Sequence, residues 1–182
     1  MAEVTIHDSR FTICHSPFTA AALALCAMLA ACGFQLRGQA KLPFQTLYVQ
    51  VNEASQFGNE LKRAIRGGSQ ATLTDKPDDA EALLAILSEA REKQILSLGA
   101  GGRVREFQLR YRVTYRVTDP KGTKVFTGPS EILLKRDFSF NDSEVLSKES
   151  EEALLYRDMQ SDAVRQLMRR LQATQIAVDT KG

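Results

Sequence analysis

Residues 107–118 have the sequence FQLRYRVTYRVT, in which apolar and polar side chains alternate without a break. Successive side chains of a β-strand point to opposite faces. A period of two over this length therefore predicts a long strand with one buried and one wet face. This strand is the clearest element of the chain, and the segments on either side of it supply the rest of the fold.

The segment that follows predicts a hairpin. Residues 119–122 have the sequence DPKG, which places Pro where its fixed φ favours a turn and Gly where a positive φ is needed. Residues 124–140 then return as the partner strand. Gly128 and Pro129 predict a bulge or break in that strand, because Pro cannot donate a hydrogen bond to a neighbouring strand.

The segments before the long strand predict a first strand and a helix. Residues 46–51 (TLYVQV) are rich in β-branched and aromatic side chains. Residues 57–65 place apolar side chains three and four apart, which predicts an amphipathic helix that stops at the two glycines 67–68. Residues 76–79 form a loop. Residues 80–98 have a helix-favouring composition, but their apolar residues hold no single period, and the residues alone leave helix and strand open.

The end of the domain predicts a second, longer helix. Asn141 followed by Glu144 resembles a capping box. Beyond it an apolar stripe recurs every four residues, as expected of a helix that packs on a sheet. A sheet with helices over one face is a two-layer α+β domain, and the chain after Gln172 is a polar tail. The stripe consists of Leu155, Met159, Ala163, Leu167 and Leu171.

The N-terminal segment predicts a secreted lipoprotein. Residues 20–31 contain only Ala, Leu, Cys and Met, a run too short for a permanent span of about 20 residues but typical of a secretory signal. Residues 29–33 (LAACG) resemble a lipobox, which is cut before Cys32 and lipidated on its sulfur. The alternative is a plain secretory signal with an incidental cysteine. Residues 1–19 hold one basic residue, Arg10, so either the start is assigned too early or the leader is atypical.

These segments divide the chain into four parts. We expect a signal peptide at 1–31, a lipidated linker at 32–44, a single domain at 45–172 and a flexible tail at 173–182. Loss of the leader leaves 23 of the 24 basic and 20 of the 22 acidic residues, a net charge of about +3. That balance is not the basic excess of a nucleic-acid-binding protein.

The composition also argues against catalysis. Both histidines, His7 and His15, lie in the predicted leader. The mature chain therefore has no Ser-His or Cys-His nucleophile pair and no imidazole for a metal site. Its acidic clusters fall in a loop and in the first turns of a helix, where acidic side chains have structural uses. We expect no enzyme, no catalytic residue, no cofactor and no metal.

Basic side chains are the strongest candidates for binding. Arg103 and Arg105 flank a glycine-rich tip, and Lys148 precedes the last helix. Arginine can donate two hydrogen bonds to one phosphate group, and lysine adds a point charge. The cluster can therefore bind an anionic, phosphorylated lipid. The alternative is that these charges only keep wet strand faces soluble. The cluster of basic side chains also includes Arg110, Arg112 and Arg116 on the solvent-exposed face of the long strand, and Lys135 and Arg136 on its partner strand.

Taken together, these pieces resemble the LptE family of lipopolysaccharide-assembly lipoproteins. Residues 32–37 (CGFQLR) are similar to the opening of the family, residues 106–108 (EFQ) to the start of its central strand, and residues 136–171 to its closing strand and helix. The family fold, a small sheet with two helices on it, implies a strand at 80–98. It also implies a mostly antiparallel, four-stranded sheet.

The resemblance implies a function. Family members sit in the inner leaflet of the outer membrane, plug and help assemble the β-barrel translocon LptD, and bind lipopolysaccharide. Gly33 is not the aspartate that retains lipoproteins at the inner membrane, which is consistent with export. Lys148 falls at a family lysine linked to lipopolysaccharide contact. A second basic contact of the family aligns with Ala100, with Arg103 and Arg105 close by. The alternative is a free-standing outer-membrane lipoprotein that binds anionic lipid or glycan without a barrel.

Overall fold

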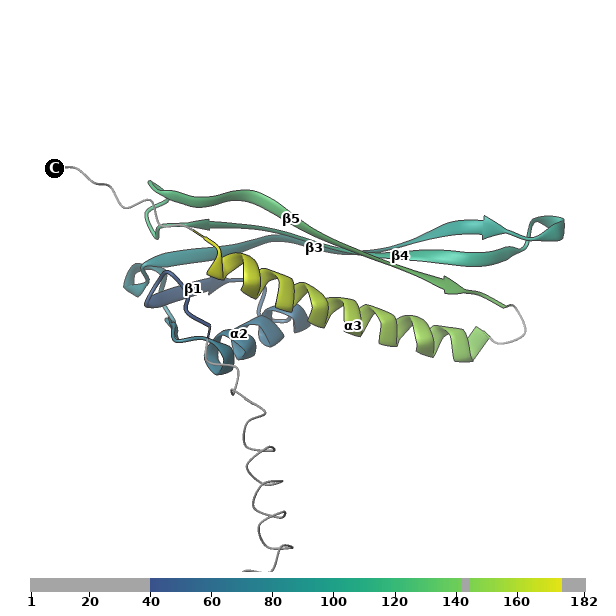
Figure 1. Cartoon of the computed structure of the whole chain (residues 1–182), viewed down its shortest axis with the longest axis horizontal. Coiled ribbons are helices and arrows are strands. Elements are labelled where there is room, and N and C mark those ends of the chain that lie inside the picture. The colour runs from purple at the N-terminus through teal and green to yellow at the C-terminus, as the bar shows by residue number, and fades with distance from the viewer. Residues whose placement is uncertain (1–39, 142–144, 175–182) are drawn as a thin grey trace, which may run out of the picture. The chain divides into compact units, whose positions relative to one another are not determined.

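The computed structural model describes residues 40–141 and 145–174 of the 182-residue chain. The predicted leader, Cys32 and the capping residue Glu144 lie outside the described residues. Figure 1 shows a sheet with two helices beneath it. In chain order the elements are β1 (Thr46–Gln50), α2 (Gln56–Gly68), β2 (Thr72–Leu73), η1 (Pro77–Asp79), β3 (Ala82–Leu98), η2 (Ala100–Gly102), β4 (Val104–Thr118), β5 (Val125–Ser139) and α3 (Val145–Gln172).

The described strands form one mixed sheet in the order β2-β1-β3-β4-β5. The long pairs, β3 with β4 and β4 with β5, are antiparallel, whereas β1 pairs in parallel with both β2 and β3. The α+β prediction is confirmed, but the described sheet has five strands rather than four. The missed strand is β2, whose two residues are too short to show any periodicity.

Both helices lie on one face of the sheet, and the core lies between the two layers (Figure 1). On β4 the side chains of Leu109, Tyr111, Val113, Tyr115 and Val117 are buried, and the residues between them are more exposed. The alternation predicted for this strand is confirmed. In α3 the four-residue stripe is buried or half-buried against the sheet, as predicted.

β3 confirms a strand at residues 82–98 and explains why its pattern was unclear. Its pairing with β4 shifts between Ile86 and Ser88 and again between Ile95 and Ser97, so Leu87 is an extra residue. One extra residue moves every later side chain to the other face of the sheet. After Leu87, the charged side chains Arg91 and Lys93 therefore share the helix-covered face with Leu84 and Ile86 of the first part of the strand.

The hairpin between β4 and β5 has the predicted turn and bulge. Gly122 has a φ of +71°, and its N–H donates to the carbonyl of Asp119 at 3.0 Å. Gly128 and Pro129 together oppose one residue of β4, because Thr127 pairs with Val117 and Ser130 with Tyr115. β5 is an edge strand, where the missing N–H of a proline is tolerated.

α2 begins and ends close to its predicted limits. The Ser55 Oγ accepts the N–H of Gly58 at 3.0 Å and caps the first turn. Ala40, from the predicted linker, forms a parallel bridge with Ser69 just after the helix. Neither helix of the described ranges combines the length and the apolar composition needed to cross a bilayer.

Candidate functional site

The β3–β4 hairpin ends in a glycine-rich tip that extends past α2 (Figure 1). The Gly99 N–H donates to the Arg103 carbonyl at 2.7 Å, and the Gly102 N–H donates to the Gly99 carbonyl at 3.2 Å. Gly101 and Gly102 have φ values of +79° and +75°, which side chains with a Cβ rarely adopt. The glycines therefore permit a compact turn that leaves Arg103 at its exit.

Arg103 and Arg105, two of the predicted cations, are both exposed at this tip. A Cβ on Gly99 would lie 2.9 Å from Cγ and Cδ of Arg105, so the arginine stem packs directly over that glycine. No hydrogen bond or ion pair to another described residue engages either guanidinium. Their donors are therefore available to an anion without breaking a contact within the described part of the chain.

Lys148, the third predicted cation, lies near the start of α3 and is mostly covered. Its side chain is 14% exposed, and its Nζ lies 2.8 Å from Oε2 of Glu151 and 3.3 Å from Oγ of Ser139. Ser139 pairs with Glu106, the residue after Arg105. The fold thus brings the three predicted cations to the same end of the sheet. Lys148 has partners there, whereas the two guanidinium groups have none within the described ranges.

Lys93 is a further cation at this end, which sequence reasoning missed. Its Nζ lies 2.6 Å from Oε2 of Glu152 and 4.2 Å from the ring centroid of Phe107. Phe107 stacks on Phe138 at 5.8 Å and meets Phe140 edge-on at 5.2 Å. The sequence offers one signal for Lys93, which is the alternation of charged residues after Leu87. That alternation predicts which side chains face the helices only if the bulge at Leu87 is already known.

Exposed aliphatic side chains surround these cations. Ile95, Leu96 and Leu98 are exposed on the last part of β3, and Leu146 is 82% exposed at the start of α3. Single exposed apolar residues are common, but several of them at the same end of the sheet as a group of cations make an amphipathic surface. We name this surface the tip end and define it by Arg103, Arg105, Lys148, Lys93, Ile95, Leu98 and Leu146.

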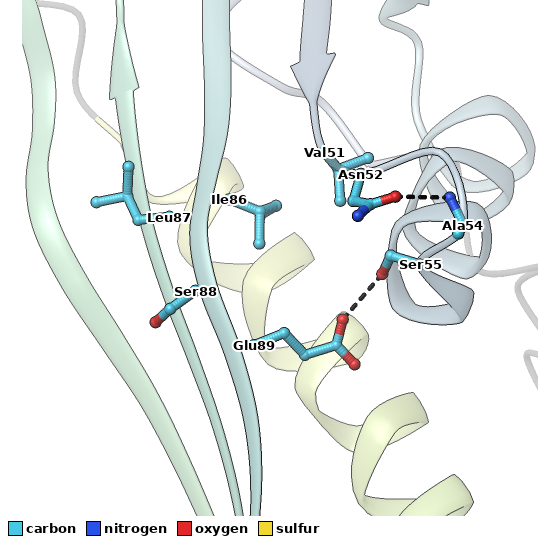
Figure 2. Close-up of a pocket in the computed structure, with 8 residues that line it drawn as sticks. All are labelled: Val51, Asn52, Ala54, Ser55, Ile86, Leu87, Ser88 and Glu89. Carbon is cyan, nitrogen blue, oxygen red and sulfur yellow. Dashed lines mark hydrogen bonds between the residues drawn. The ribbon is translucent and has the colours of Figure 1, made fainter.

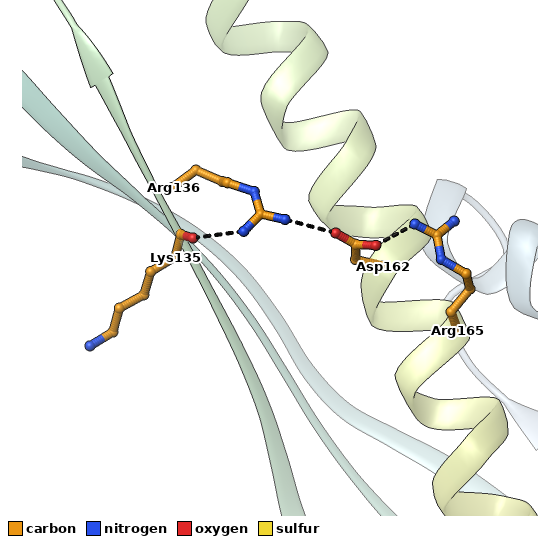
Figure 3. Close-up of polar contacts among 4 residues, drawn as sticks. All are labelled: Lys135, Arg136, Asp162 and Arg165. Atoms are coloured by element: carbon orange, nitrogen blue, oxygen red, sulfur yellow. Dashed lines mark hydrogen bonds and ion pairs between the residues drawn. The ribbon is translucent and has the colours of Figure 1, made fainter.

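The row of arginines on β4 does not form a comparable cluster. Arg112 lies 3.4 Å from a carboxylate oxygen of Glu131 and 3.8 Å from one of Glu92. The Nε of Arg110 donates to Gln108 at 2.9 Å. Carboxylates of β3 and β5 thus lie beside Arg112. Such mixed charges are expected if these side chains only keep the exposed face of the sheet soluble. On β5, Arg136 is held by Asp162 at 3.0 Å, and Asp162 also contacts Arg165 (Figure 3).

The remaining polar clusters have structural partners. A pocket of about 400 Å³ lies between the β1–α2 loop and β3, where Oε2 of Glu89 accepts a hydrogen bond from Oγ of Ser55 at 2.9 Å (Figure 2). The other carboxylate oxygen of Glu89 accepts from the Tyr111 hydroxyl at 2.7 Å. Glu89 is thereby engaged with the cap of α2 and with the core. Within the described ranges no three His, Cys, Asp or Glu side chains are grouped as metal ligands.

Comparison with known proteins identifies the family. The sequence model of the LptE family, described as lipopolysaccharide-assembly, matches residues 44–171. The chain belongs to the LptE family. Relatives named LPS-assembly lipoprotein LptE include one from Yersinia enterocolitica, 31% identical over 78% of this chain and 69% of the relative. Another, from Photorhabdus laumondii, is 27% identical over 78% of each chain.

Solved structures agree with an LptE-family fold. The solution structure of an uncharacterised lipoprotein B from Nitrosomonas europaea is similar with a TM-score of 0.68 and 42% identity, covering 78% of this chain and 91% of that one. A rare lipoprotein B from Shewanella oneidensis has a TM-score of 0.62 at 24% identity over 71% and 95% of the two chains, which supports the fold alone. The recognition made from the sequence motifs is confirmed.

Proposed function

We propose that this protein is a non-catalytic outer-membrane lipoprotein subunit of the lipopolysaccharide translocon. Lipid on Cys32 anchors it at the periplasmic face of the membrane. It plugs and helps assemble an LptD-type β-barrel, and it binds lipopolysaccharide during transport to the cell surface. Membership of a lipopolysaccharide-assembly family is the observation that carries this proposal.

The tip end is the surface we assign to lipopolysaccharide contact. Lipopolysaccharide joins phosphate groups to acyl chains, so its receptor needs cations beside apolar surface. The guanidinium groups of Arg103 and Arg105, which no described residue engages, and the ammonium of Lys148 supply charge-assisted donors. Exposed Leu98 and Leu146 supply the apolar part. The contact should weaken with rising salt, because the arginines are solvent-exposed and therefore screened.

The test is a pull-down of the full-length lipoprotein from outer membranes in mild detergent, with mass spectrometry of the proteins that accompany it. We expect a large outer-membrane β-barrel in stable amounts. A matched pull-down with an unrelated outer-membrane lipoprotein controls for detergent carry-over. Recovery of the protein alone from native membranes would contradict the translocon role. It would favour the alternative of a free-standing lipoprotein that binds anionic lipid or glycan.

A further inference from the structure

The exposed face of α2 carries three cations that no described residue engages. Successive residues of a helix are rotated by about 100°, so Lys62, Arg63 and Arg66 lie within an arc of about 100° around the axis. Arg63 and Arg66 are exposed and Lys62 is half-buried, and none of the three has a hydrogen bond or ion pair with another described residue. Glu60, the one acidic residue of α2, is turned to α3, where it accepts two hydrogen bonds. The exposed face of the helix is therefore basic.

Two carboxylates lie near this face without cancelling its charge. Glu53 and Asp75 line the same hollow as Lys62 and Arg66, yet within the described ranges no ion pair joins these carboxylates to the two cations. Lys41, which is exposed and follows the residue that bridges to the end of α2, adds another cation. We define the α2 basic face by Lys41, Lys62, Arg63 and Arg66.

The N-terminal linker meets the domain at the end of this helix. The Ala40 N–H donates to the carbonyl of Gly68, the last residue of α2, at 2.7 Å, and the Ala40 carbonyl accepts the N–H of Gln70 at 3.2 Å. Arg66 and Lys62 precede Gly68 by two and six residues, or about 3 and 9 Å along the helix. The cations thus lie close to the point where the linker leaves the domain.

The length of the linker limits how far this end of the domain can lie from the membrane. Ala40 follows Cys32 by eight residues, and an extended chain covers at most about 3.6 Å per residue, or about 29 Å. The linker cannot hold the tip end in the same way. β1 pairs with the first residues of β3, and the seventeen residues of β3 extend about 55 Å from there to the tip (Figure 1).

We propose that the α2 basic face docks on the anionic phospholipid headgroups of the leaflet that holds the Cys32 lipid. This inference rests on the lipid anchor of the proposed function and adds to it a contact that orients the domain. The lipid holds the chain on the membrane, and the basic face turns the α2 end toward the leaflet and the tip end away from it. Headgroup phosphates accept charge-assisted hydrogen bonds from guanidinium and ammonium groups, and an anionic surface attracts basic segments beside a membrane anchor.

The test uses the full lipidated chain in vesicles that contain no barrel and no lipopolysaccharide. Once the leader is removed, Cys32 is the only cysteine and its sulfur carries lipid, so a cysteine introduced elsewhere takes a single fluorophore. Gly67→Cys places the fluorophore beside the α2 basic face, where an added Cβ meets no atom within 4 Å. Nitroxide groups on the lipid headgroups quench the fluorophore when the face lies on the membrane.

The expected result is quenching that depends on anionic lipid. The fluorophore at Gly67→Cys is quenched more in vesicles with phosphatidylglycerol than in phosphatidylcholine alone, and high salt removes the difference. Each cation favours the docked state about fivefold, and three together about a hundredfold. Lys62→Gln, Arg63→Gln and Arg66→Gln combined therefore lower the quenching to its value in neutral vesicles. A fluorophore at Ala100→Cys, on the tip, is quenched little in either kind of vesicle.

A matched control removes three cations from the face of the sheet that the helices do not cover. Arg110→Gln, Arg116→Gln and Lys135→Gln combined change the net charge equally and keep the quenching that depends on anionic lipid. Circular dichroism checks the fold of each variant. Lys62→Gln with Arg66→Gln replaces the triple substitution on α2 if the latter does not fold.

The outcomes separate this inference from the proposed function. Equal quenching in neutral and anionic vesicles, or anionic quenching that survives the triple substitution on α2, would overturn the inference. The roles with the barrel and with lipopolysaccharide would stand, because the vesicles contain neither. If the triple substitution leaves the quenching unchanged but lowers recovery of the barrel in a pull-down, the face binds protein and the inference is wrong. A lipidated chain that does not stay on the vesicles would overturn the anchor, and the inference with it.

Discussion

At the residue scale, the network around Tyr111 joins the core to the start of α2. The Tyr111 hydroxyl donates to Glu89, whose other carboxylate oxygen accepts from the α2 cap Ser55. Burial, reinforced by the hydrogen bond to Glu89, raises the pKa of Tyr111 well above its ordinary value of 10. Burial also raises the pKa of Tyr156, whose hydroxyl donates to the backbone carbonyl of Glu92.

These shifts predict a loss of stability in alkali. Above pH 10 a tyrosine of the unfolded chain loses its proton, whereas Tyr111 in the folded chain keeps it, so the free energy of unfolding falls as pH rises. Between pH 9 and 11 Tyr111 contributes about 1.4 kcal/mol to this fall. Urea denaturation at pH 9 and pH 11 should show that the free energy of unfolding falls less in Tyr111→Phe than in the wild-type protein. That variant should also be about 1 kcal/mol less stable than wild type at pH 7. An equal fall in both proteins would contradict the assignment.

The tip cations give a second prediction at this scale. Lys148→Asp combined with Arg103→Asp should weaken lipopolysaccharide binding by at least about tenfold, because two charge-assisted contacts are lost and repulsion is added. The control is Arg116→Asp, an exposed position at the other end of β4. Circular dichroism should report the native fold in both variants. Unchanged binding with a native spectrum would remove the tip end as the binding surface.

At the element scale, the bulge in β3 explains why the apolar residues before and after it do not follow one period. Ile86 pairs with Tyr115 and Ser88 with Thr114, so Leu87 has no partner on β4. α3 contacts both outer strands of the extended part of the sheet. The Tyr156 hydroxyl reaches the Glu92 carbonyl on β3, and an Arg170 nitrogen reaches the Glu131 carbonyl on β5, each at 2.7 Å.

This geometry predicts the effect of two deletions. Removal of Leu87 should leave the fold intact, because Ile86 and Ser88 then occupy consecutive places and the pairing on both sides keeps its register. Removal of Arg112 from the unbulged centre of β4 should abolish folding, because it turns half of the buried face outward. Urea denaturation with circular dichroism compares the two. Equal damage by both deletions would argue against a bulge at Leu87.

At the scale of the whole molecule, the proposed lipid attachment lies outside the segment that the family model matches. The predicted lipid site, Cys32, precedes the residues matched by the family, which begin at residue 44. Acyl chains contribute about 0.8 kcal/mol per buried methylene, so we propose that anchoring depends on lipid at Cys32 rather than on the surface of the domain.

Cys32→Ala tests this anchor. The thiol is required for the thioether, so the variant should incorporate no radioactive palmitate and should leave the outer-membrane fraction. The domain expressed from residue 40 provides the folded reference, and its circular dichroism should match that of the wild-type protein. Palmitate incorporation by Cys32→Ala would show that lipid is attached at another residue.

The sequence by itself determined the α+β class, the long β4 strand, the turn and bulge of the following hairpin, and the buried stripe of α3. These features depend on local periodicity and on the special backbones of Gly and Pro, which are visible without the fold. Family motifs supplied the strand at 80–98, which periodicity alone had left open. β2 was missed because two residues carry no pattern.

Only the tertiary structure decided which cations are available. Lys93 lies on β3 and its ion-pair partner Glu152 on α3, and Lys148 of α3 contacts Ser139 of β5, so both contacts depend on how α3 crosses the sheet. The β4 arginines looked equivalent to Arg103 and Arg105 in the sequence, yet Arg112 is flanked by carboxylates of neighbouring strands. Charge partners across a sheet are set by register and bulges, and one extra residue such as Leu87 reverses the faces of the side chains up to the next register shift.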